Sequence, residues 1–193
     1  MTVAVVYFSN TGTTHQIAEA ISNGVVQQGC ACELLRIAVE PNINGRLMVD
    51  HNSIERQLGV IDQSDAVIFG SPTYMGGPAA PFKEFADESS DRWDGQIWNG
   101  KLAAGFTVGA NPGGDQLATL QYFSILAAQH GMLWVNLDMP ADHEHNTGSK
   151  LNAQLGFAGV SPTGKVSGAD KRAAVHLGAR VAMFSERLRL NKT

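Results

Sequence analysis

The sequence predicts an α/β fold, in which a parallel β-sheet has helices on both faces. Five short apolar segments alternate along the chain with segments of helical periodicity, an order that is typical of βαβ units. No internal repeat and no domain boundary is visible in the 193 residues, a length that one hydrophobic core can organise. We therefore expect a single domain over residues 1–193.

The first strand and the helix after it are the most clearly marked elements. Val3–Phe8 is a run of six apolar residues, largely β-branched or aromatic, which predicts a fully buried strand. A helix is expected over Thr14–Gln28, ended by Gly29. The residues expected on its core face are Ile17, Ala20, Ile21 and Val25.

The remaining elements follow from the same two periodicities, with Gly and Pro marking their ends. Further strands, the first at a sheet edge and the second ended by Gly70, are expected at Cys30–Ile37, Ala66–Phe69, Leu102–Val108 and Met132–Leu137. Further helices are expected at Ser53–Arg56, Pro81–Asp87, Leu117–Gln129 and Ala169–Leu188. Long loops are expected at Pro41–His51, Ser89–Gly100 and Asp138–Gly168.

The hydroxyl-rich turn Ser9–Thr14 predicts an anion site between the first strand and the first helix. The orphan N–H groups and the positive dipole end of a helix N-terminus attract anions. Capping alone needs one or two hydroxyls, whereas this turn has four, together with Gly12 and no Lys or Arg. Neutral donors without a P-loop lysine suit the terminal phosphomonoester of a mononucleotide such as FMN.

Two later loops offer contacts for a flat ring. Ser71–Gly77 combines a constrained Pro72 with Thr73, an aromatic Tyr74 and a polarisable Met75. Gly109–Asp115 is rich in glycine, so its backbone N–H groups can approach a ligand carbonyl. Because each of the three loops follows a strand of the predicted sheet, we expect them to converge on one site at its carboxyl edge.

Composition excludes several classes of partner. The net charge is −4 and no basic run exists, which argues against nucleic acid and against a membrane surface. No apolar run approaches the ~20 residues needed to span a bilayer. The first strand begins within two residues of Met1, so we expect no signal peptide and a cytoplasmic location.

Three further patterns favour ordinary structural roles. Cys30 and Cys32 are too few for a zinc site and are expected to be buried, reduced thiols. Gly159–Lys165 has Walker A spacing but lacks the Mg²⁺-binding hydroxyl, which predicts a loop. Asp142–His145 could offer a metal three ligands, yet a solvated or interfacial loop is favoured, and no metal is expected. No Gly-x-Ser-x-Gly elbow supports a nucleophile triad.

The three loops, in this order, resemble those of the WrbA-type NAD(P)H:quinone oxidoreductases, in the NADPH-dependent FMN reductase family of the flavodoxin-like superfamily. Ser9–Thr14 is similar to the flavodoxin phosphate loop, and Ser71–Gly77 with Phe82–Phe85 is similar to the family's isoalloxazine loop. Further matching segments are Gly100–Phe106, Gly113–Gly114 and His130–Met132. The resemblance extends to Val135 and returns weakly in the last helix. It implies a flavodoxin-like three-layer sandwich with a five-stranded parallel sheet in the order 2-1-3-4-5.

The resemblance also implies a cofactor, an electron donor and an oligomer. FMN would be reduced by NAD(P)H and would pass two electrons to a quinone in a dimer or tetramer whose neighbouring subunit completes the substrate site. The implied FMN contacts are Ser9, Asn10, Thr11, Gly12, Thr13, Thr14, Pro72, Thr73, Tyr74, Met75, Gly76, Val108, Gly109, Ala110, Asn111, Gly113 and Gln129. The implied substrate contacts are Trp93 and Thr11. No side chain is expected to act as a catalytic acid or base.

Two positions depart from the family pattern. Thr11 stands where the family usually has an aromatic residue near the nicotinamide, and Gln129 replaces the first of two consecutive histidines. Gln129 can donate a hydrogen bond to a flavin carbonyl but cannot protonate it.

Two alternatives to the reductase remain open. One is a flavodoxin-type one-electron carrier that docks protein partners, and the other is an interaction protein that keeps a flavin for stability. The modest net charge and the long loops around Trp93 and His143 argue against the carrier.

Overall fold

The parallel sheet has the predicted strand order. The structure is a computed structural model that describes residues 1–41, 47–111, 115–139 and 154–190. The strands lie in the order β2-β1-β5-β7-β8, and each neighbouring pair is parallel, which confirms the order 2-1-3-4-5. Their bounds are Ala31–Arg36 for β2, Thr2–Tyr7 for β1, Ala66–Tyr74 for β5, Leu102–Gly109 for β7 and Leu133–Trp134 for β8.

Two segments of the chain fill the fifth strand position. β8 pairs with the first residues of β7, and β9, Phe157–Val160, pairs with the last ones. The expected strand Met132–Leu137 is therefore hydrogen-bonded as a strand only at Leu133–Trp134, although the Val135 amide still donates to the Ala103 carbonyl at 2.7 Å. The carboxyl half of the fifth position comes from a segment in which we expected only a loop.

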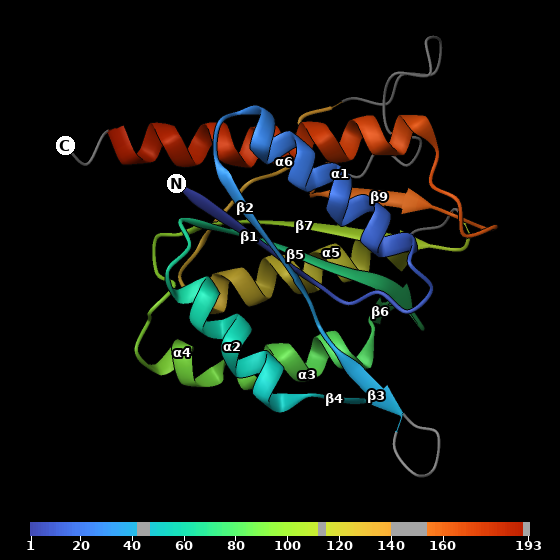
Figure 1. The fold of residues 1–193 in the computed structure, drawn as a ribbon, viewed down its shortest axis with the longest axis horizontal. Coiled ribbons are helices and arrows are strands. Elements are labelled where there is room, and N and C mark those ends of the chain that lie inside the picture. The colour runs from blue at the N-terminus through green and yellow to red at the C-terminus, as the bar shows by residue number, and fades with distance from the viewer. Residues whose placement is uncertain (42–46, 112–114, 140–153, 191–193) are drawn as a thin grey trace.

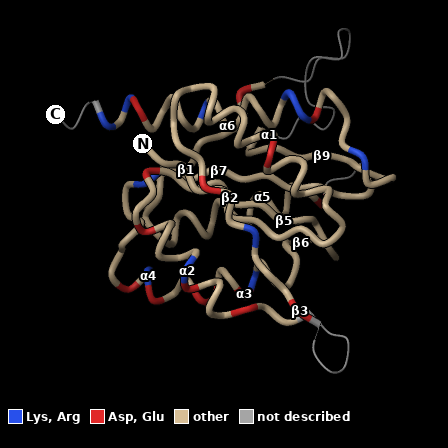
Figure 2. The backbone as a smooth tube through the Cα atoms, in the orientation of Figure 1, with Lys and Arg blue, Asp and Glu red and all other residues tan. Residues whose placement is uncertain are grey.

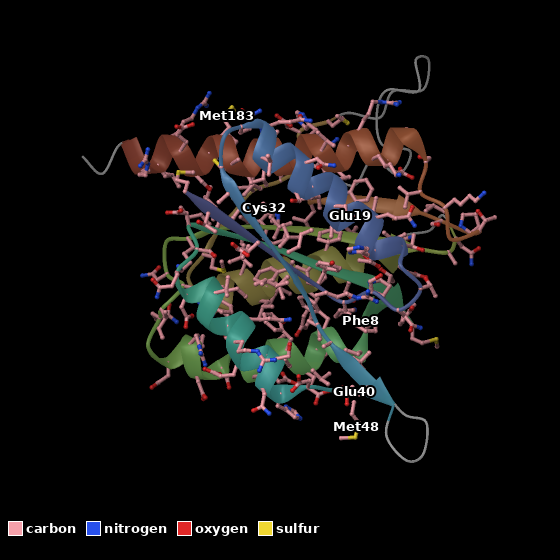
Figure 3. All side chains as sticks on the ribbon, viewed as in Figure 1. Phe8, Glu19, Cys32, Glu40, Met48 and Met183 are labelled. Carbon is pink, nitrogen blue, oxygen red and sulfur yellow. The ribbon has the colours of Figure 1, made fainter. Side chains whose placement is uncertain are left out.

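The sheet is the middle of three layers (Figure 1). α1 (Thr13–Gln27) and α6 (Gly168–Leu190) cover one face, while α2 (His51–Asp62), α3 (Ala80–Glu88) and α5 (Asp115–Gln129) cover the other. Alternate residues of β1 face two different cores. Val3, Val5 and Tyr7 pack with α1 and α6, whereas Ala4, Val6 and Phe8, which directly follows the strand, pack on the opposite face. Figure 3 shows Phe8 on the α2–α3 side and Cys32 on the α1–α6 side.

The expected core faces of the helices are confirmed. Ile17, Ile21 and Val25 of α1 are fully buried, as are Phe82 and Phe85 of α3. Gly29 follows α1 with φ +77°, the left-handed conformation that ends a helix. The predicted thiols are unpaired; Cys30 is buried and Cys32 half-buried, and burial raises the pKa of both.

Several expected loops contain secondary structure. The segment expected as a loop from Pro41 to His51 contains β4 (Leu47–Val49), which pairs antiparallel with β3 (Val39–Pro41). Glu40 and Met48 project from this pair in Figure 3. Within 89–100, α4 (Ser90–Asp94) is a short helix. The helix expected at Ser53–Arg56 is longer and forms α2, which begins at His51. It continues beyond Arg56 because Leu58 and Ile61 extend the buried face that Ile54 begins. β9 includes Gly159 and Val160, so the Walker-like segment is not wholly a loop.

The strand β5 continues beyond the glycine at which we expected it to end. Gly70 lies inside β5, and a Cβ atom there would be 2.1 Å from Cζ of Phe106 on the neighbouring strand. The glycine therefore leaves space for a buried ring and does not interrupt the strand. In the described ranges, no helix is both long enough and apolar enough to cross a membrane.

Candidate functional site

The structure brings the three predicted loops to one edge of the sheet. In the parallel registers, Tyr7 at the end of β1 pairs with Gly70, and Pro72 near the end of β5 pairs with Val108. The loops that follow β1, β5 and β7 are therefore neighbours at the carboxyl edge, beside the start of α1 (Figure 1). This is the position at which open α/β sheets bind ligands.

The phosphate loop, residues 9–14, presents a helix N-terminus with free donors. Gly12 is the N-cap of α1 with φ +90°, a conformation that side chains other than glycine rarely adopt. The amides of His15 and Gln16 donate to Ser9 Oγ and to the Gly12 carbonyl, at 3.2 and 3.1 Å. Helix geometry leaves the preceding amides, those of Thr13 and Thr14, without acceptors in the helix, so an anion can accept from them.

The hydroxyls of this loop differ in exposure. Ser9, Thr13 and Thr14 are buried, while Asn10 and Thr11 are exposed. Thr11 Oγ1 lies 3.4 Å from Thr13 Oγ1. The buried hydroxyls shape the floor of the loop, and the exposed side chains of Asn10 and Thr11 remain accessible to a second ligand.

A cation that the sequence did not suggest lies beside the phosphate loop. Arg36 is the last residue of β2, and its Nη2 donates to the Ser9 carbonyl at 2.7 Å. Arg36 is 27 residues from Ser9 in sequence, and only the pairing of β1 with β2 brings the two together. The anion site therefore has a guanidinium nearby in addition to its neutral donors.

His15, in the first turn of α1, is half-buried against the end of β1. Its Nδ1 lies 2.6 Å from the Tyr7 hydroxyl, its ring stacks on that of Tyr7, and its Nε2 lies 3.5 Å from Glu19. Burial raises the pKa of the Tyr7 hydroxyl, which therefore stays protonated at neutral pH. The first turn of α1 is thus fixed to the end of β1 by a side-chain hydrogen bond.

The ring loop, residues 71–77, ends in an exposed two-residue tip. Pro72 is buried, Tyr74 is 46% exposed and Met75 is 104% exposed. Met75 has φ +49°, an uncommon conformation outside glycine, and Gly76 follows with φ +79°. An apolar side chain held out in this way at a strand end is available to pack on a flat ligand.

The hydroxyl of Thr73 points into the protein, toward two other threonine hydroxyls. Thr73 Oγ1 lies 2.8 Å from Thr107 Oγ1 and 2.8 Å from Thr119 Oγ1, and Thr107 Oγ1 donates to the Ser71 carbonyl at 2.7 Å. Thr107 and Thr119 are fully buried. Sequence analysis did not identify these two residues, because the contact requires α5 and β7 to meet behind β5.

The third loop is also supported from behind. The side chain of Gln116 is buried, and its Nε2 donates to the Asn111 carbonyl at 2.8 Å. Its Nε2 would lie 2.3 Å from a Cβ atom at Gly109, so the strand end passes directly over this amide. Ala110 and Asn111 are exposed, and Gly113 lies outside the described residues.

Two expected contacts, Trp93 and Gln129, lie at the opposite, amino edge of the sheet. Trp93 is in α4, shortly before β7 begins, and Gln129 is the last residue of α5, shortly before β8 begins. Gln96 brings the two together, since its Nε2 donates to the Trp93 carbonyl at 2.8 Å and to the Gln129 carbonyl at 3.3 Å. Trp93 is 48% exposed, and Gln129 is also exposed. Within one chain, neither reaches the phosphate loop.

A buried histidine stands behind these two residues. Ser89 Oγ donates to the Ala86 carbonyl at 2.7 Å, so its 2.9 Å contact with His130 Nε2 requires the histidine to donate. The buried Nδ1 of His130 has no partner in the described part of the chain, which disfavours a second proton there and favours the neutral ring with its proton on Nε2. Its ring packs on the buried Trp98 with centroids 4.3 Å apart, and burial lowers the pKa of His130.

One group of possible metal ligands lies apart from the three loops. His51, Glu84 and Glu88 offer ligand atoms within 4.8 Å of one another, and His51 hydrogen-bonds Glu88. The histidine side chain is 62% exposed, and the group shares no residue with the predicted site. Asp142–His145, the candidate from the sequence, lies outside the described residues.

Comparisons with known proteins agree with this geometry. The model of the NADPH-dependent FMN reductase family matches residues 1–146. Flavodoxin FldP of Pseudomonas aeruginosa is 32% identical over 95% of this chain and 96% of its own length. An NAD(P)H dehydrogenase (quinone) of Archaeoglobus fulgidus is 30% identical over 96% of this chain and 98% of its own.

Solved structures show the same relationship. The flavodoxin, WrbA-like protein from Agrobacterium tumefaciens superposes with a TM-score of 0.75 at 36% identity, over 96% of this chain and 98% of that one. The expected resemblance, the fold class and FMN as cofactor are therefore confirmed. The chain belongs to the NADPH-dependent FMN reductase family, as a flavodoxin-like oxidoreductase that uses FMN with NAD(P)H as electron donor.

Proposed function

We propose that this enzyme reduces quinones or similar small acceptors by two electrons, with FMN bound at the carboxyl edge of the sheet. The observation that supports this proposal is the juxtaposition of a helix N-terminus lined by hydroxyls with the exposed tip Tyr74–Met75. The first suits a phosphomonoester and the second suits a flat ring. The names of the relatives favour a quinone as the acceptor.

The residues present fit FMN, and each loop has a distinct part in holding it. The amides of residues 11–14, the loop hydroxyls and nearby Arg36 would hold the phosphate. Thr73, Tyr74 and Met75 would contact the ring, with Ala110 and Asn111 offering backbone groups at another side. When bound, FMN supplies the redox chemistry, since it accepts a hydride and passes on a pair of electrons. The protein excludes water and orients the reactants, and the proposal assigns no catalytic acid or base.

A second copy of the chain would complete the substrate site. Trp93 and Gln129 lie at the amino edge, so a dimer or tetramer is needed if they are to reach the flavin of a neighbour. The surface of α5 supports an assembly of this kind. Asp115 is the only charged residue of α5, and Leu117 and Ile125 are 44% and 61% exposed. A helix face without charge is typical of a buried contact.

A one-electron carrier is the second candidate, because one relative is named a flavodoxin. Carriers dock protein partners through strongly charged surfaces. Figure 2 shows acidic residues along α3 and α4, whereas the whole chain has a net charge of only −4. This modest charge favours a small-molecule acceptor over a docked protein.

An anaerobic titration separates the two candidates. We expect the purified protein to be yellow with FMN, to bleach rapidly with NADH or NADPH, and to recolour when a benzoquinone is added. A protein that NAD(P)H does not bleach, and that forms a stable semiquinone on photoreduction, would be the carrier.

Mixing two inactive variants tests the shared site. The first has Thr11→Val and Thr14→Val, and the second has Trp93→Ala. If a neighbour supplies Trp93, a mixed oligomer contains some sites with an intact phosphate loop and an intact tryptophan. We expect quinone reduction to reappear on mixing under conditions that allow subunits to exchange. No recovery in oligomers shown to be mixed would contradict the shared site.

A further inference from the structure

Three threonines behind the ring loop form a directed chain of hydroxyl groups. Each hydroxyl has one proton to donate. Thr107 donates its proton to the Ser71 carbonyl, at 2.7 Å, so its oxygen must accept the proton of Thr73. The oxygen of Thr73 in turn accepts from Thr119, at 2.8 Å. The chain therefore runs Thr119 → Thr73 → Thr107 → Ser71, and it leaves Thr73 no proton for a ligand.

The chain connects three separate elements of the site. Thr119 lies in α5, Thr73 in β5 and Thr107 in β7, and α5 follows the loop that begins after β7. Thr107, Thr119 and Ser71 are fully buried, so water cannot replace a lost partner. The ring loop is thus fixed to β7 and α5, the two elements that flank the third loop, through the fully buried side chains of Thr107 and Thr119.

The base of the ring loop is closed by the Ala79 amide, which donates to Ser71 Oγ at 2.9 Å, but the tip is held less firmly. At the tip, the end of β5 forms a short antiparallel ladder of two residue pairs, in which Thr73 pairs with Pro78 and Tyr74 pairs with Gly77. Met75 at the tip has φ +49° and is fully exposed, so it makes no packing contact that could set the loop position. Thr73 is the last residue of β5 with a buried anchor.

We infer that Thr107 and Thr119 are positioning residues for the flavin ring, acting through Thr73. This inference rests on the proposed flavin site, because it concerns the loop assigned to the ring. Loss of the Thr119 donor removes one of the two hydrogen bonds of the Thr73 hydroxyl and leaves only its bond to Thr107. The backbone of Thr73–Tyr74 is then held less firmly and can move relative to the third loop. A displaced ring loop affects the ring and leaves the phosphate contacts intact.

The experiment compares FMN with riboflavin, which lacks the phosphate. Thr119→Val keeps the side-chain volume and removes the donor. We expect it to weaken FMN and riboflavin by the same factor, about tenfold, and to shift the absorption bands and midpoint potential of bound FMN. Thr119→Ser retains the donor and should restore both ligands to within about twofold of wild type.

A control variant excludes a general loss of structure. Ser64→Ala removes another buried hydroxyl, which donates to the Val60 carbonyl at the other edge of the sheet, and it should leave riboflavin affinity unchanged. Thr107→Val leaves the buried Ser71 carbonyl without its donor. If that variant does not fold for this reason, Thr119→Val still tests the inference.

The two proposals fail in different ways. Hydrogen exchange at the amides of Tyr74–Gly77 in the flavin-free protein should accelerate in Thr119→Val, and this readout needs no cofactor. Unchanged exchange together with wild-type riboflavin affinity and potential would overturn the positioning role. A wild-type protein that binds neither FMN nor riboflavin would overturn the proposed function and leave the exchange result to stand on its own.

Discussion

The carboxyl and amino edges of the sheet contribute different kinds of residue to the expected site. The carboxyl edge presents hydroxyls, backbone amides and the exposed Met75, with Arg36 nearby. The amino edge presents the half-exposed indole of Trp93 and contains a buried pair of rings, His130 and Trp98. β7 spans eight residues, so at ~3.3 Å per residue the edges lie on the order of 20 Å apart.

This separation shows that residues predicted together from sequence motifs need not form one site within one chain. The carboxyl edge has the chemistry for a cofactor, and the amino edge has the chemistry for a flat apolar contact. An oligomer can combine them, so we expect cofactor binding and substrate reduction to respond to different substitutions.

The largest expected effect concerns the phosphate loop. Replacing Thr11 and Thr14 by Val removes two hydrogen bonds to a charged group, each contributing ~1.5–3 kcal/mol. FMN affinity should fall by about a hundredfold or more, while riboflavin affinity changes little. Fluorescence titration of both ligands measures this difference. Thr2→Val, at the amino edge, is the matched control, and equal losses of both ligands would place the phosphate elsewhere.

A smaller effect, on stability, is expected from replacing a glycine in the middle of the sheet. Gly70→Ala places a methyl group 2.1 Å from the Phe106 ring and should lower the free energy of unfolding by ~1–3 kcal/mol. Gly59→Ala, in the exposed middle of α2 with no atom within 4 Å, should raise it by up to ~1 kcal/mol. Urea denaturation checks both, and an unchanged Gly70→Ala midpoint would mean that the ring can move aside.

The amino edge should show a pH dependence of moderate size. Burial lowers the pKa of His130 in the folded state, so the unfolded chain takes up the proton first as the pH falls. The contribution of neutral His130 to the free energy of unfolding is therefore complete at neutral pH. It declines as the pH falls below the ordinary histidine pKa of about 6.5, by at most ~1.4 kcal/mol per pH unit. His130→Gln keeps a donor toward Ser89 without titrating, and it should flatten this decline in urea denaturation between pH 7.5 and 5.5.

His51 supplies the control with the opposite sign. Its hydrogen bond to Glu88 raises its pKa, so its contribution is present at low pH and is lost as the pH rises. His51→Gln should therefore steepen the decline toward acid. If the loss of stability toward acid is unchanged in His130→Gln, it arises from carboxylates and not from His130.

The smallest expected effect is that of Trp93→Ala on FMN affinity. Trp93 lies at the other edge from the phosphate loop, so in dilute protein the affinity should stay within about twofold of wild type. At concentrations that favour oligomers, quinone reduction should fall much more than FMN binding. A large loss of FMN in the monomer would show that Trp93 acts within its own chain.

The local hydrophobic pattern of the sequence was sufficient to predict the main strands and helices. Apolar runs and helical periodicity predict β1, α1, α3 and α6 because burial of a whole face leaves a repeated signal. β9 was missed because Phe157–Val160 is only four residues long and joins the sheet by pairing with a distant strand. Gly70 was misjudged because a close ring and a strand end both select glycine.

The candidate site was predictable at the level of loops and less so at the level of side chains. Parallel strands that each precede a helix must end at one edge, so the convergence of the three loops followed from the alternation. The same alternation places the end of α5, and hence Gln129, at the other edge. Arg36 beside Ser9 and Thr119 beside Thr73 depend on strand register and helix packing, which no local pattern encodes.

The divided fifth strand position has a consequence for the order in which the chain folds. β9 pairs with β7 only after a segment on the order of 50 residues has been synthesised, and contacts so distant in sequence form late. A nascent chain that ends after β8 has its phosphate loop but lacks the strand beside the third loop. Cofactor capture during synthesis should therefore wait for the C-terminal part of the chain, although the first proposed cofactor contacts lie near the N-terminus.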